Sequence, residues 1–111
     1  MSTDVLVITS QGHPARLSVV GEIDLGTRQQ FEEALARVIG GDGDTHLDLQ
    51  GVPFMDTHSV TAIVHCAHRL SGEGGRLIVQ NPPDSLIRIY TMLWASHDGA
   101  GLFIEGLEGH A

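Results

Sequence analysis

The stretch from residue 45 to residue 70 constrains the fold of this chain most strongly, because it joins a strand pattern directly to a helix pattern. Residues 45–49 alternate polar and apolar side chains, which predicts a strand. Beyond Gly51-Val52-Pro53, apolar residues recur at helical spacing, which predicts a helix. The inner face of this helix is expected to comprise Val60, Ile63, Val64, Ala67 and Leu70. A strand that leads into a helix is the repeating unit of an α/β sheet.

Shorter periodic segments cover most of the remaining chain. Strands are expected at residues 5–9, 15–20, 45–49, 76–80 and 102–104, and helices at residues 28–39, 57–70 and 84–93. The first two strands flank a turn at residues 11–14 and predict a hairpin. Because crossovers between parallel strands keep one hand, we expect one domain over residues 1–111 with a core at about 5–104. Its fold class is α/β, a mixed β-sheet of four to five strands with helices packed mainly on one side.

Residues at the expected helix ends support these boundaries. Thr27 is placed to cap the first helix, and Gly40-Gly41 would end it. Pro82-Pro83 prevents a helix before Asp84, which is a suitable cap for the third helix. Inner-face residues would be Phe31, Leu35 and Val38 in the first helix and Leu86, Ile87, Ile89, Tyr90 and Leu93 in the third.

Composition disfavours several classes of function. The 111 residues carry a net charge of −8, and the six Lys and Arg residues form no run. Nucleic acids and anionic membranes need basic patches, so a basic or mixed-charge protein surface is the better expected partner. The single cysteine, Cys66, can form neither an internal disulfide nor a thiolate metal site alone. The sequence shows neither a signal segment nor a long apolar span, so we expect a soluble cytoplasmic protein.

The chemistry concentrates where the central strand passes into the second helix. Val52-Pro53-Phe54-Met55 leads to an acid, Asp56, and then to Thr57, His58 and Ser59, the candidate first residues of the helix. The first amide groups of a helix and the positive end of its dipole favour a nearby anion such as a phosphate. Two interpretations follow: a control point that carries a phosphate, or simple capping of the helix by a hydroxyl.

Several segments, in order, resemble the STAS domain family, which includes the anti-sigma factor antagonists, or anti-anti-sigma factors, of bacteria. They are Gly21-Glu22-Ile23-Asp24, the run LDLQGVPFMDT at residues 47–57, Gly74-Gly75-Arg76-Leu77, Pro82 and the helix at residues 86–93. The resemblance covers residues 5–104 in order and spacing. It implies a small binding module with no catalysis of its own and no cofactor.

In the sporulation-type members, a hydroxyl residue just after the Asp of an F-x-D-S-S-G-like motif is phosphorylated by a serine/threonine kinase that is itself the anti-sigma factor. The unmodified module binds this kinase and frees the sigma factor, whereas the phosphorylated module releases it. By position, Thr57 matches the phosphorylated residue and Asp56 the preceding acid. Asp24 matches an acid close to that site, where it would orient the hydroxyl, contact the kinase or cap the following helix.

The chain departs from the family motif after Thr57. His58 and Ser59 stand where the motif usually has Ser and Gly, so Ser59 becomes a second candidate for phosphorylation. Loss of the Gly means either that the turn needs no positive φ here or that it is arranged differently. Thr57 keeps a hydroxyl but adds a methyl group that some kinases reject.

The outer face of the second helix is the expected partner surface. At 3.6 residues per turn, His58 and His65 lie nearly in line opposite the apolar face, with Arg69 beside them. The expected partner-binding residues are Asp24, Asp56, Thr57, His58, Ser59, Thr61 and His65. A metal ion shared by His65 and His68 is a competing interpretation, but the sequence fixes no third ligand. Histidine is the side chain that most readily changes charge near neutral pH, so these residues would make partner binding pH-dependent.

Enzyme functions find little support in the sequence. A phosphoaspartate receiver needs further acids after its first strand, and residues 5–10 supply none. The glycine-rich segments lack the Lys-Ser/Thr of a P-loop. Cys66, in the middle of a helix, is typical of a packing residue. A metal- or thiol-dependent enzyme is a remote alternative. A STAS module that docks permanently, for example on a lipid-transport ATPase, stays open. So does weak self-association through the strand at residues 102–104.

Overall fold

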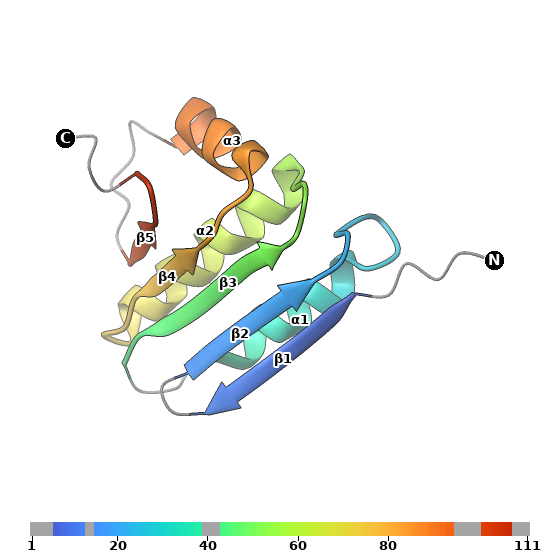
Figure 1. Ribbon diagram of the computed structural model, residues 1–111. Helices are drawn as coiled ribbons and strands as arrows, with labels where there is room; N and C mark the ends of the chain where they lie inside the picture. The colour runs from blue at the N-terminus through green and yellow to red at the C-terminus, as the bar shows by residue number, and fades with distance from the viewer. Residues whose placement is uncertain (1–5, 13–14, 39–42, 95–100, 108–111) are drawn as a thin grey trace.

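The computed structural model describes residues 6–12, 15–38, 43–94 and 101–107 (Figure 1). In chain order the elements are β1 (Val7–Gly12), β2 (Ala15–Val20), α1 (Arg28–Val38), β3 (Thr45–Gly51), α2 (Thr57–Gly72), β4 (Leu77–Gln80), α3 (Asp84–Trp94) and β5 (Leu102–Ile104). The expected helix end at Gly40-Gly41 and part of the expected turn, residues 13–14, lie outside the described ranges.

The five strands form one mixed sheet in the order β1-β2-β3-β4-β5. β1 and β2 are antiparallel, whereas the later pairs are parallel, as expected for a hairpin followed by strand–helix crossovers. Helices α1 and α2 cover the same face of the sheet, and α3 lies near the end where β3 passes into α2 (Figure 1). The predicted fold class is therefore confirmed.

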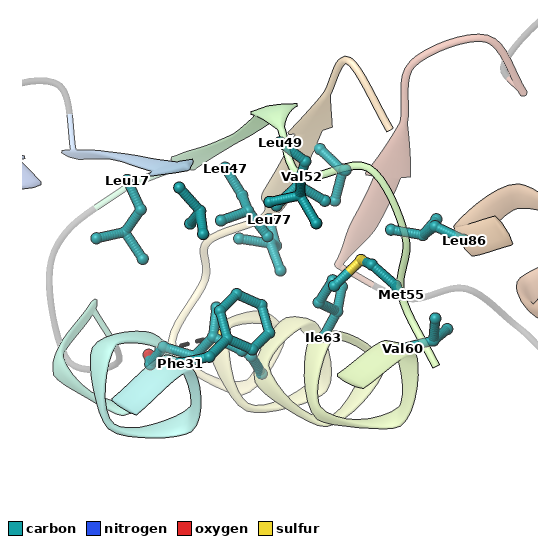
Figure 2. Packing of buried hydrophobic residues seen from close by; sticks show 14 of the residues in the cluster. Leu17, Phe31, Leu47, Leu49, Val52, Met55, Val60, Ile63, Leu77 and Leu86 are labelled. Carbon is teal, nitrogen blue, oxygen red and sulfur yellow. Dashed lines mark hydrogen bonds between the residues drawn. The ribbon is translucent and has the colours of Figure 1, made fainter. Parts of the chain in front are cut away.

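The core lies between the sheet and helices α1 and α2. Leu47 in β3 pairs in register with Leu17 in β2 and with Val79 in β4, so these side chains form one row on the helix-facing side. Phe31 from α1 and Ile63 from α2 pack toward this row, and all five residues are buried (Figure 2). Because burial of apolar area is the main stabilising contribution, this layer fixes the position of α2 on the sheet.

The first strand differs from its predicted boundaries. β1 spans Val7–Gly12, whereas the sequence predicted a strand at residues 5–9, of which residue 5 lies outside the described ranges. Gln11 and Gly12, expected in the turn, pair with Arg16 and Ala15 of β2. The Gln-Gly dipeptide suggested an early turn, but the antiparallel ladder satisfies the backbone hydrogen-bonding groups up to Gly12. The predicted hairpin is confirmed with a longer first strand.

β3 also continues beyond its predicted end at residue 49, as far as Gly51. An irregularity between Ser18 and Val20 brings Gly51 opposite Val20, and the Gly21 N–H donates to the Gly51 carbonyl at 3.0 Å. A Cβ at position 51 would lie 2.8 Å from Val20 Cγ2, so only glycine permits this close approach. The contact joins the loop before α1 to the loop before α2.

The buried face of α2 is rotated from the predicted one. Val64 was expected on the inner face but is only half-buried, whereas Cys66 is buried with its Sγ 3.7 Å from the Leu35 carbonyl oxygen of α1. The neighbouring helix α1 explains the difference, because it covers one flank of α2 that a helix on a bare sheet would expose.

Helix α3 contacts the core mainly through its first turn. Ser85 and Leu86 are buried there, whereas Leu93, predicted on the inner face, is exposed near the other end. Asp84 is the first residue of the helix rather than its cap, because the Pro83 carbonyl already accepts the Leu86 N–H at 3.0 Å. An acid in this first turn still suits the helix dipole.

Candidate functional site

The loop between β3 and α2 is anchored at Met55. Its side chain is fully buried in the core (Figure 2). The Met55 N–H donates to Ser85 Oγ at 2.8 Å. The next residue, Asp56, has an extended backbone with φ −97° and ψ 177°, and its Oδ1 accepts the Ser59 N–H at 2.9 Å. This is the geometry of an N-cap, so Asp56 caps α2.

Thr57 is the first residue of α2, and its side chain is exposed. Its hydroxyl forms no hydrogen bond with any residue in the described ranges. Capping, which the sequence left open as the role of this hydroxyl, is instead performed by Asp56. The Thr57 hydroxyl is therefore accessible to an external group.

Ser59 differs from Thr57 in being buried, with 1% of its surface exposed. Within the described part of the chain, its Oγ has no hydrogen-bond partner. Reaching this hydroxyl would require the first turn of α2 to open, which argues against Ser59 as a phosphorylation site or a partner contact. Among the described non-glycine residues only Asn81 has a positive φ, so the missing motif glycine leaves Ser59 in ordinary helical geometry.

Asp24 serves the turn before α1. Its Oδ1 accepts the N–H groups of Gly26 at 2.9 Å and Thr27 at 3.1 Å. The Thr27 hydroxyl donates to the Glu22 carbonyl at 2.8 Å and accepts the Asp24 N–H at 2.9 Å, so it braces the loop instead of capping α1. The Asp24 carboxylate therefore holds the turn before α1 and accepts no N–H group of the helix itself. Within the described ranges it forms no hydrogen bond with Thr57.

Arg28 links this turn to the start of α2. Its Nη2 lies 3.6 Å from Asp56 Oδ2, and the two side chains are 28% and 39% exposed. Partial burial favours a higher pKa for the Asp56 carboxyl, but the Ser59 N–H and the charge of Arg28 together lower this pKa below its usual value. Arg28 was not among the site residues expected from the sequence. The available signal was a basic residue in the first turn of a helix, where the dipole disfavours it.

A groove of about 540 Å³ runs between α1 and α2. Buried Leu35 and Cys66 form its floor. The α2 wall carries Thr57, His58, Thr61, His65 and Arg69, and Glu32 and Ala36 line the α1 wall. Four of the seven predicted partner-binding residues thus share one concave surface. The other three predicted residues do not line the groove: Asp56 caps α2, Ser59 is buried in the first turn of α2, and Asp24 lies in the turn before α1.

Two exposed apolar side chains near this end of the sheet were also missed as site residues. Leu25, in the turn before α1, is 82% exposed, and Phe54, in the loop before α2, is 60% exposed. Both loops follow neighbouring strands and are joined through Gly21 and Gly51. Exposed large apolar groups on adjacent loops are typical of protein-binding surfaces. Phe54 could have been identified from its place in the motif, whereas Leu25 had no such signal.

Metal and thiol chemistry find no support in this geometry. Across the described ranges, no three His, Cys, Asp or Glu side chains lie close enough together to hold a metal ion. Burial raises the pKa of the Cys66 thiol to about 11, so the thiol is protonated at neutral pH and is a poor nucleophile.

The mixed sheet with its helices has the architecture that the resemblance to STAS domains predicts. A family model described as "Mlab, STAS domain" matches residues 6–97. The chain therefore belongs to the STAS domain family. No curated protein sequence matches the chain.

Solved structures with the same fold include anti-sigma factor antagonists. One from Mycobacterium paratuberculosis superposes with a TM-score of 0.67 and 22% identity, covering 92% of this chain and 88% of the other. The antagonist SpoIIAA in its unphosphorylated form gives a TM-score of 0.65 and 16% identity, covering 90% and 86%. At these identities the likeness establishes the fold. Among the described helices, none combines the length and apolar character needed to cross a membrane.

Proposed function

We propose that this STAS domain is a cytoplasmic anti-sigma factor antagonist. In its unmodified state it binds an anti-sigma factor that is also a serine/threonine kinase, and phosphorylation of Thr57 by that kinase releases it. The observation that carries the proposal is the free, exposed hydroxyl of Thr57 at the start of α2, where Asp56 performs the capping. The likeness in fold to anti-sigma factor antagonists supports the same choice.

The docking surface that we propose is the α1–α2 groove together with Phe54 and Leu25. The groove offers an acid on α1, Glu32, and the basic side chain of Arg69 on α2. This arrangement suits a partner with a mixed-charge face. The exposed Phe54 and Leu25 side chains would supply the apolar contacts that typically anchor such interfaces.

Phosphorylation would act on this surface through charge. A phosphate on Thr57 adds about −1.5 to −2 charges next to the ionised Asp56 and at one end of the groove. A partner that covers the groove must remove water from that charge, which costs several kcal/mol unless a basic group compensates. A cost of about 3 kcal/mol lowers affinity by roughly 100-fold. Release therefore requires no change of fold.

Intact-mass analysis with peptide mapping tests the proposal. The protein is isolated from its native cells, and a second sample is incubated with ATP and its co-purifying partner. We expect one phosphate, on the peptide that contains Thr57. Thr57→Ala should abolish the modification, while Thr9→Ala, which removes an exposed threonine on β1 away from the groove, should leave it unchanged. A phosphate on neither Thr57 nor Ser59, with a partner still bound, would contradict the switch.

A second candidate is a STAS domain that docks permanently, for example on a lipid-transport ATPase. The specific observation in its favour is that the matching family model carries the description "Mlab, STAS domain". In that case the groove would be occupied whatever the state of Thr57. Co-purification of an ATPase at equal yield with wild-type, Thr57→Ala and Thr57→Glu proteins would favour this candidate, whereas loss of a kinase partner only with Thr57→Glu would favour the antagonist.

A further inference from the structure

Arg28, the first residue of α1, forms no side-chain hydrogen bond with the described residues, and its Nε is buried. A guanidinium group can donate five hydrogen bonds. Within the described ranges the Arg28 side chain makes none, and its Nε is buried without a partner. Its ion pair with Asp56 is 3.6 Å long, which is beyond hydrogen-bonding distance. Because a buried donor without an acceptor is unfavourable, an acceptor that reached the Arg28 Nε–H would stabilise this side chain, and the described residues of the unmodified site do not supply one.

Arg76 is an arginine of the same molecule whose side chain does form hydrogen bonds. Its Nη2 donates to Asp44 Oδ2 at 2.9 Å, and its Nε approaches Asp44 Oδ1 at 3.4 Å. The Arg76 side chain is 60% exposed, so it has water as a further acceptor. Arg28 is more buried than Arg76 and yet has the looser ion pair.

We infer that Arg28 is the group that receives the phosphate on Thr57, its guanidinium moving from Asp56 to the phosphate oxygens. The inference rests on the proposed function, because it requires a phosphate at that position. Asp56 and Thr57 are consecutive, so the Thr57 side chain that would carry the phosphate belongs to the residue next to the one that Arg28 already faces. A phosphate carries more charge than a carboxylate, and its oxygens match the two-pronged geometry of arginine.

The exchange leaves the start of α2 intact. Asp56 uses Oδ1 to cap the helix through the Ser59 N–H and Oδ2 to face Arg28, so the cap survives when Arg28 moves away. The modified side chain would then be tied to the first residue of α1. Phosphorylation would thus add an anion to the groove and hold it against the start of α1.

The test uses full-length protein made with phosphothreonine at position 57 by genetic encoding, so it does not depend on the natural kinase. The second ionisation of the phosphate, normally near pH 6, is followed by ³¹P NMR. We expect a pKa about 0.5 unit lower in the Arg28 protein than in Arg28→Gln, with partial recovery in Arg28→Lys. Arg76→Gln is the matched control and should leave the value unchanged. His58→Gln measures how much the neighbouring histidine contributes to the pKa of the phosphate.

A purely structural role for Arg28 would give equal phosphate pKa values in wild-type and Arg28→Gln proteins, and that result would overturn the inference. If Arg28→Gln does not fold, the ¹⁵N–¹H resonance of Arg28 Nε in the wild-type protein replaces the comparison of phosphate pKa values as the readout. This resonance should shift on phosphorylation of the wild-type protein, and an unchanged resonance would equally overturn the inference. Neither measurement involves a partner, so failure of the kinase-binding proposal would be seen separately, in the mass and affinity experiments.

Discussion

Helices α1 and α2 both begin beside an aspartate and a threonine, but the two threonines have opposite roles. Before α1, Thr27 lies three residues after Asp24, is 9% exposed and forms hydrogen bonds to Glu22 and Asp24. At the start of α2, Thr57 directly follows Asp56 and is exposed with its hydroxyl unbonded to the described residues. Residue type alone therefore does not distinguish an exposed hydroxyl from a buried, hydrogen-bonded one; the position of the threonine relative to the neighbouring aspartate does.

The same relation between an aspartate and the third residue after it accounts for the burial of Ser59. Ser59 lies three residues after Asp56, as Thr27 lies three residues after Asp24, and in both cases the carboxylate accepts the N–H of that third residue. This hydrogen bond draws the third residue under the turn, and both side chains are buried. The residue directly after the acid stays at the surface.

The largest expected effect on stability comes from Thr27. Thr27→Val should lower the free energy of unfolding by about 2 kcal/mol, because the Asp24 N–H and the Glu22 carbonyl lose a shared partner in a loop that is partly buried. Urea denaturation followed by circular dichroism measures the change. A loss below about 0.5 kcal/mol would show that the Thr27 hydroxyl is no more important than that of Thr57.

Removing the cap of α2 should have the next largest effect. Asp56→Ala is expected to cost about 1 kcal/mol of unfolding free energy, because the Ser59 N–H loses its acceptor. Asp56→Asn keeps an acceptor at the same place and should recover most of the loss. Equal losses in the two variants would indicate that the charge of Asp56, rather than its capping hydrogen bond, stabilises the helix start.

The charge of Asp56 is expected to make the stability of the fold depend on pH. Its folded-state pKa is lowered, so its contribution to stability is present above the unfolded-state pKa of about 3.9 and is lost as the pH falls through the folded-state pKa. Wild-type protein should therefore lose more stability than Asp56→Asn between about pH 5 and pH 2. Parallel curves for the two proteins, measured by thermal unfolding, would mean that Arg28 and the Ser59 N–H do not favour the ionised form.

The smallest effect on stability is expected for Thr57. Thr57→Val should change the free energy of unfolding by less than about 0.5 kcal/mol, because an exposed hydroxyl without a protein partner is removed. The same denaturation experiment as for Thr27→Val gives a direct comparison of the two threonines. A loss near 2 kcal/mol would show that Thr57 has a structural role and would weaken its assignment as the switch.

Much of this arrangement follows from local sequence patterns. The alternation at residues 45–49 and the apolar spacing after residue 57 correctly predicted β3 and α2, and the order of segments correctly predicted the family. Four predicted partner-binding residues of α2 share the groove because helical periodicity places them on one face. Their use in binding stays a prediction.

The remaining features depend on contacts between segments far apart in the chain. Arg28 meets Asp56 only because α1 and α2 start at the same end of the sheet, and Cys66 is buried because α1 covers that flank of α2. The extension of β3 to Gly51 needs the backbone of Val20 beside it. No pattern within one segment contains this information. The predicted weak self-association through β5 is likewise a matter of contacts between chains and stays a prediction.

The most direct test of the account is the affinity of the anti-sigma factor for this protein with and without phosphate on Thr57. Isothermal titration would compare the unmodified protein, the protein carrying phosphothreonine at position 57 and Thr57→Val in the presence and absence of ATP. We predict that the phosphate weakens binding by at least about 100-fold. Thr57→Val should bind as the unmodified protein does and be unaffected by ATP. Equal affinity of the phosphorylated and unmodified proteins would contradict the central claim and leave permanent docking as the function of the groove.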